Sequence, residues 1–138
     1  MTDYGKRASR SFLGGSGCAR AIAETFGGTA DVYIDAAAEL AAPFEHAETN
    51  RQELCGAIRG MYMAISMIYS PESDEAQIIA SELTEKFRKK FGAVACRELI
   101  SDTEQTQVPV ADRMPRCAEY IEYAADLLAR QLMDYGRI

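Results

Sequence analysis

The chain has 138 residues, of which 48% are hydrophobic and 26% are charged, and its formal net charge is −6. This length predicts a single helical domain over residues 1–138, with a core that needs no disulfide. The negative charge argues against a nucleic-acid partner, and no run of about 20 apolar residues is present for membrane insertion. No signal-peptide pattern follows the first residues, so we expect a cytoplasmic protein in a reducing compartment.

The first half of the chain shows helical spacing of apolar residues. A short helix is expected over residues 4–13, ending at two glycines. Ser16 is the predicted N-cap of a second helix, in which Cys18, Ile22 and Phe26 share one face. A third helix is expected over residues 31–42, where Pro43 ends it.

The most apolar stretch, residues 53–69, predicts a central helix with two unlike stripes. One stripe carries large apolar side chains, and the other consists of Gly56, Gly60 and Ala64. Each glycine inside a helix costs about 1 kcal/mol relative to alanine, so the pair implies a packing or site requirement. Cys55 lies in the early turns of this predicted helix, beside Gly56.

Three further segments complete the expected fold. A long helix is predicted from Ser70 to Lys90, with a buried stripe of Ala76, Ile79, Leu83 and Phe87. A short helix over residues 93–100 carries Cys96. After a polar connection, Pro115 begins a last helix whose stripe includes Cys117, Ile121, Ala124, Leu128 and Leu132. These elements predict an all-α fold, a compact bundle of five to six helices around the central apolar helix.

Four cysteines, Cys18, Cys55, Cys96 and Cys117, are spread over the chain with no local C-x-x-C pair. This spacing excludes zinc ribbons and thioredoxin-type sites, because those use at least one close pair, so only tertiary folding could gather the four. Three of them fall in the first turns of predicted helices, where unpaired N–H groups favour thiolate. Arg59, one turn after Cys55, could add positive charge. Alternatively, all four are inert core thiols, since cysteine packs like a small hydrophobe.

The segment from Cys55 to Gly60 reads CGAxxG. With Cys18 before it and Cys96 and Cys117 after it, nearly the whole chain resembles the family of redox-active proteins labelled C_GCAxxG_C_C. That label writes its first two motif letters in the other order, so the match rests on the whole arrangement.

The resemblance implies a small helical protein associated with oxidoreductases, with some relatives built into iron–sulfur cytochromes. It implies that Cys18, Cys55, Cys96 and Cys117 are metal ligands that converge on a two-iron cluster. Gly56 and Gly60 would leave room for that cluster or for a neighbouring helix. One departure is that the glycine-rich stretch expected after an aromatic residue is missing after Phe44, which would alter any cofactor or partner that docks there.

These observations leave two functions open. The first is a redox-active protein that uses its cysteines for electron transfer or redox sensing, through an iron–sulfur cluster or reversible dithiol/disulfide pairs, with a redox partner protein or oxidoreductase. The second is a non-enzymatic helical binding or assembly module whose cysteines only pack. The sequence assigns no catalytic residue, because no base is positioned beside a cysteine nucleophile and the one histidine, His46, lies in a charged loop segment.

Overall fold

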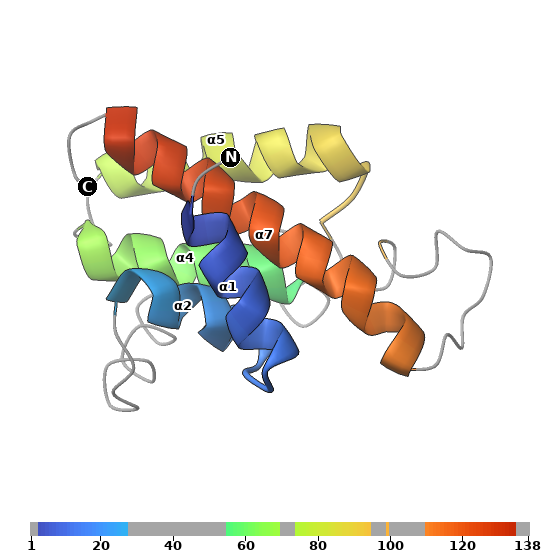
Figure 1. Cartoon of the computed structure of the whole chain (residues 1–138). Helices are drawn as coiled ribbons and strands as arrows, with labels where there is room; N and C mark the ends of the chain where they lie inside the picture. Colours follow the sequence, from blue (N-terminus) through green and yellow to red (C-terminus); the bar gives the residue numbers. More distant parts are fainter. Residues whose placement is uncertain (1–2, 28–54, 70–73, 95–98, 100–109, 135–138) are drawn as a thin grey trace.

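The computed structural model describes residues 3–27, 55–69, 74–94, 99 and 110–134. Within these ranges the chain forms five helices and no strand, which confirms the all-α fold (Figure 1). The helices are α1 (Asp3–Leu13), α2 (Cys18–Gly27), α4 (Gly56–Ile68), α5 (Asp74–Phe91) and α7 (Val110–Asp134). The predicted helix over residues 31–42 lies outside the described residues. No described helix combines the length and apolar sequence needed to cross a bilayer.

Two helices, α4 and α7, hold the bundle together. α7 packs against α1, α2, α4 and α5, and α4 packs against α2, α5 and α7. In Figure 1, α4 runs between α5 above it and α2 below it, and α7 crosses the molecule diagonally. The expected central apolar helix is therefore present, and α7 shares its central place.

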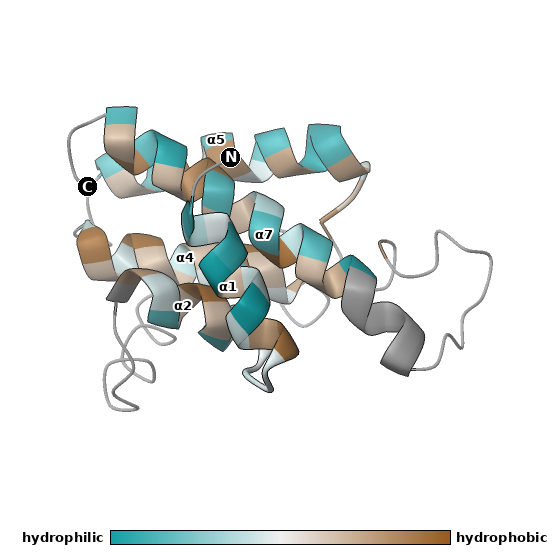
Figure 2. Cartoon of the chain, viewed as in Figure 1, coloured by the Kyte–Doolittle hydropathy of each residue, from teal (hydrophilic) through white to brown (hydrophobic). Residues whose placement is uncertain are grey.

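The interior matches the predicted apolar stripes. Along α5, Ala76, Ile79, Leu83 and Phe87 are all buried, as are Ile121, Ala124, Leu128 and Leu132 along α7. In Figure 2 the hydrophilic colour of α5 is concentrated on one side of the helix, as expected for an amphipathic surface helix. The buried polar groups of this region bond to one another: the Tyr62 hydroxyl lies 2.7 Å from Thr84 Oγ1, which donates to the Ala80 carbonyl.

A glycine-dependent turn joins α1 to α2 and confirms the predicted end of the first helix. Gly15 has a φ of 117°, a conformation that side chains disfavour. Its N–H donates to the Phe12 carbonyl at 3.0 Å, and the Ser16 N–H donates to the Ser11 carbonyl at 3.1 Å. This is the hydrogen-bond pattern of a glycine C-cap, and it reverses the chain so that α2 can begin at Cys18.

The last helix begins earlier than the sequence predicted. α7 starts at Val110 and continues through Pro115, which was expected to be its first residue. Proline favours the first helical position because it lacks an N–H, but that preference is a tendency, and a helix can continue past proline with one hydrogen bond missing. Cys117 consequently lies about two turns inside α7, so the expected effect of a helix start on this thiol does not apply.

Candidate functional site

Three of the four cysteines line one cavity. Cys18 comes from the start of α2, Cys55 from the residue before α4, and Cys117 from α7. The cavity measures about 20 Å³, room for about one water molecule. Its walls are Cys18, Cys55, Gly56, Ala57, Leu99, Cys117, Tyr120 and Ile121. Cys96 lies outside the described residues.

The sequence predicted that Cys55 lies in the early turns of the central helix. In the structure Cys55 is instead the N-cap of α4, one residue before the helix begins. Its ψ of 136° is not helical, and its N–H donates to the Val94 carbonyl at 2.8 Å. Its own carbonyl accepts the N–H of Arg59 at 3.1 Å, the first bond of the helix. This position leaves the Cys55 side chain 7% exposed at the wall of the cavity.

Cys18 and Cys117 line the same cavity from two different helices. The hydrogen bond from the Cys117 side chain lowers the pKa of Cys18 from 9.0 to about 7; burial opposes this shift, and the Cys18 backbone N–H adds to it. Cys18 and Cys117 are both half-buried. These two cysteines and Cys55 are free thiols and form no disulfide. Because the thiolate is the reactive form of cysteine, a pKa near neutrality makes Cys18 a ready nucleophile.

Gly56 and Gly60 let the backbone of α2 lie directly against α4. A Cβ atom at position 56 would overlap the Cβ of Cys18 and lie 3.4 Å from its sulfur. A Cβ at position 60, one turn further along α4, would lie 2.6 Å from the carbonyl oxygen of Ala19. The two glycines therefore allow the close helix approach that the sequence predicted, and this approach brings Cys18 to Cys55.

Tyr120 is a site residue that the sequence reasoning missed. Its hydroxyl donates to the Leu99 carbonyl at 3.1 Å, and its ring meets that of Phe91 edge-on at 4.7 Å. The available signal was its spacing: Tyr120 follows Cys117 by three positions, which places both on one helix face. Arg59, in contrast, is exposed and does not line the cavity.

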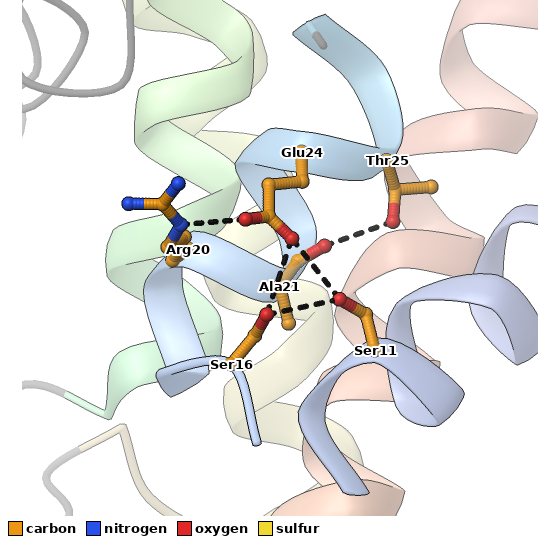
Figure 3. Close-up of polar contacts among 6 residues, drawn as sticks. All are labelled: Ser11, Ser16, Arg20, Ala21, Glu24 and Thr25. Atoms are coloured by element: carbon orange, nitrogen blue, oxygen red, sulfur yellow. Dashed lines mark hydrogen bonds and ion pairs between the residues drawn. The ribbon is translucent and has the colours of Figure 1, made fainter. Parts of the chain in front are cut away.

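A polar network fixes the turn that precedes Cys18 (Figure 3). The Glu24 carboxylate accepts hydrogen bonds from Ser11 at 3.1 Å, Ser16 at 3.2 Å and Arg20 at 2.5 Å. Burial raises the pKa of Glu24, but the Arg20, Ser11 and Ser16 hydrogen bonds outweigh it and hold that pKa below its usual range. The Ser16 hydroxyl, predicted as an N-cap, thus donates to a carboxylate further along the helix.

The family model described as "Putative redox-active protein (C_GCAxxG_C_C)" matches residues 16–131. The chain belongs to this family. The matched range contains all four cysteines and the CGAxxG segment, so the resemblance seen in the sequence is confirmed. Comparison with curated proteins and with solved structures gave no match.

The iron–sulfur cluster implied by the resemblance can be tested against the residues at the cavity. Thiols are the right donors for such a cluster. However, no three Cys, His, Asp or Glu side chains in the described part of the chain are grouped as a metal ion requires. The described residues therefore form a compact thiol site and not, by themselves, a ready-made cluster site.

Proposed function

We propose that this protein performs reversible redox chemistry with Cys18, Cys55 and Cys117 at the shared cavity and Cys96 as the fourth thiol. The observation that carries the proposal is that Cys18, Cys55 and Cys117, which come from three separate parts of the chain, line one small cavity. Thiols that only fill a core can pack against any apolar group, so the gathering of three of them at one cavity, one with its pKa lowered, favours redox chemistry over the alternative of a binding module with inert cysteines.

Reversible formation of a disulfide is the best-supported form of this chemistry. Two thiols that line the same small cavity need little movement to form an S–S bond, a step that releases two electrons and the protons still held by the sulfurs. The site adds no charged side chain among its described walls, so the thiols themselves are the reacting groups. A redox partner protein or oxidoreductase would exchange those electrons, in a cytoplasm that keeps the thiols reduced.

A second candidate, a two-iron cluster with four cysteine ligands, is favoured by the position of Cys96 in the chain. Val94, two positions before it, accepts the N–H of Cys55, and Leu99, three positions after it, lines the cavity. The described residues that flank Cys96 in the sequence therefore both lie at the thiol site. A bound cluster would supply one-electron transfer for an electron carrier or redox sensor.

Protein purified without oxygen distinguishes these forms. The dithiol form predicts a colourless protein that contains no iron or sulfide and loses two titratable thiols on oxidation with diamide, all regained with dithiothreitol. The cluster form predicts visible absorption bands with iron and sulfide in equal amounts. A colourless, iron-free protein whose thiols react only after unfolding would contradict both forms and leave the cysteines as packing residues.

A further inference from the structure

The three described thiols differ in how a substrate could reach them. Cys18 and Cys117 are half-buried, whereas Cys55, the N-cap of α4, is only 7% exposed. Attack on a substrate requires that its reacting atom come within bonding distance of the sulfur, so access selects Cys18 and Cys117 over Cys55.

The same two thiols reach the cavity from separate helices, and their positions in those helices differ. Cys18 is the first residue of α2, where unpaired backbone amides favour the negative charge of a thiolate. Cys117 lies about two turns inside α7, where the backbone amides are already paired within the helix. The thiolate is therefore favoured at Cys18, and interaction with the Cys117 side chain lowers the pKa of Cys18 further.

The walls of the cavity indicate what kind of substrate suits this pair. Apart from the thiols, they consist of apolar or small residues and Tyr120, whose hydroxyl is engaged with the Leu99 carbonyl. No carboxylate, histidine or cation among the described wall residues could serve as a general base or hold a charged substrate group. Thiol–disulfide exchange needs neither, because the thiolate is itself the nucleophile and the S–S bond is apolar.

From these observations, and resting on the proposed redox function, we infer that Cys18 and Cys117 form the exchanging pair for a disulfide substrate, with Cys18 attacking and Cys117 resolving. The Cys18 thiolate attacks one substrate sulfur, which forms a mixed disulfide and releases a substrate thiolate that takes a proton from solvent. Cys117 then attacks the Cys18 sulfur, and its proton passes to the second substrate thiolate as that group leaves. Two electrons move from the cysteine pair to the substrate, which ends as two thiols.

The test uses reduced, full-length protein without oxygen and two probes, glutathione disulfide as a small disulfide and oxidised thioredoxin as a protein disulfide. With an accepted probe, the wild type should lose two hydrogens in mass, and peptide mapping should find the bond between Cys18 and Cys117. Cys117→Ser should instead accumulate the mixed disulfide on Cys18, and Cys18→Ser should lose the reaction. Reaction with only one probe identifies the source of the substrate disulfide.

Other outcomes separate this inference from the broader proposal. A bond that maps to Cys55 or Cys96, or a mixed disulfide that forms first on Cys117, would overturn the assigned pair or its order while leaving a redox-active protein. Failure of both probes, where diamide still oxidises two thiols, would overturn the disulfide substrate alone. The wild-type map decides the pair even where a variant does not fold.

Discussion

The two halves of α4 are built on different principles. From Gly56 to Gly60 the helix has almost no side chain facing α2, and backbone meets backbone beside the thiols. From Met61 to Ile65 every residue is buried through its side chain, including the large Tyr62. Toward α2 the first half is thus fixed by the shape of the main chain, although its Ile58 is fully buried, and the second half is fixed by the volume of its side chains.

The difference between the two halves of α4 shows what determines the geometry of the cysteine site. Backbone atoms in two packed helices cannot move separately, so a contact of 2.6 Å between an added Cβ and the Ala19 carbonyl would shift a whole helix. In the second half a side chain that loses a methyl group leaves a small void that its neighbours partly fill. Single-methyl changes in the two halves therefore test the comparison directly.

The largest effect is expected for Gly60→Ala. The added methyl would lie 2.6 Å from the Ala19 carbonyl oxygen and 2.9 Å from Ile22 Cβ. We expect the free energy of unfolding to fall by about 1–3 kcal/mol, although alanine gains about 1 kcal/mol in helix propensity. Urea unfolding followed by circular dichroism measures this loss.

Gly17→Ala is the matched control for Gly60→Ala, because a Cβ at position 17 would meet nothing within 4 Å. It should leave the urea midpoint close to that of the wild type. If Gly60→Ala were as stable as Gly17→Ala, the backbone contact between α2 and α4 would not be the feature that fixes the first half of α4.

A smaller loss is expected for Ile65→Val, which removes one methyl from the buried second half. The cost should be about 0.5–1.5 kcal/mol, typical of such a deletion in a core. The same urea titration measures it, and the reactivity of Cys18 should not change, since Ile65 does not line the cavity. A loss larger than that of Gly60→Ala would reverse the comparison.

Tyr120→Phe removes one hydrogen bond at the cysteine end without changing the ring. The Leu99 carbonyl would lose its 3.1 Å partner, at a cost of about 0.5–1.5 kcal/mol in unfolding free energy. The Tyr120 ring still packs against Phe91 in this variant, so only the hydrogen bond to Leu99 is lost. If that bond keeps Leu99 in place at the cavity, alkylation of Cys117 should be faster in the variant than in the wild type. Hydrogen exchange at Leu99, unchanged between wild type and variant, would show that the hydroxyl does not hold this segment.

The smallest change in structure is the protonation of Cys18. The pKa of Cys18, about 7, lies below the ordinary 9.0, so the fraction of Cys18 in the thiolate form increases as the pH rises through 7. The stability linked to this group is accordingly present above pH 9 and lost as the pH falls toward 7. Iodoacetamide alkylation of Cys18, followed by mass spectrometry, should rise with a midpoint near pH 7.

Cys117→Ala provides the comparison for this pH profile, because it removes the hydrogen bond that is the main cause of the lowered pKa. The midpoint for Cys18 should move toward 9. An identical midpoint in both proteins would show that Cys117 does not control the protonation of Cys18.

The sequence by itself determined the helical class, most buried stripes and the family, because helical periodicity and the CGAxxG motif are local patterns. It also showed that Gly56 and Gly60 needed a reason, since glycine is costly inside a helix. It placed the starts of α4 and α7 wrongly, because cap and proline preferences are small energies that packing overrides.

Only the tertiary structure decided which thiols share a cavity. Cys18 and Cys117 are far apart in the sequence, and their position at one cavity depends on how closely α2, α4 and α7 approach one another. Those distances arise from the combined packing of many side chains and from two missing Cβ atoms, so no local pattern encodes them. The sequence contains the four cysteines, and the fold determines which of them share a site.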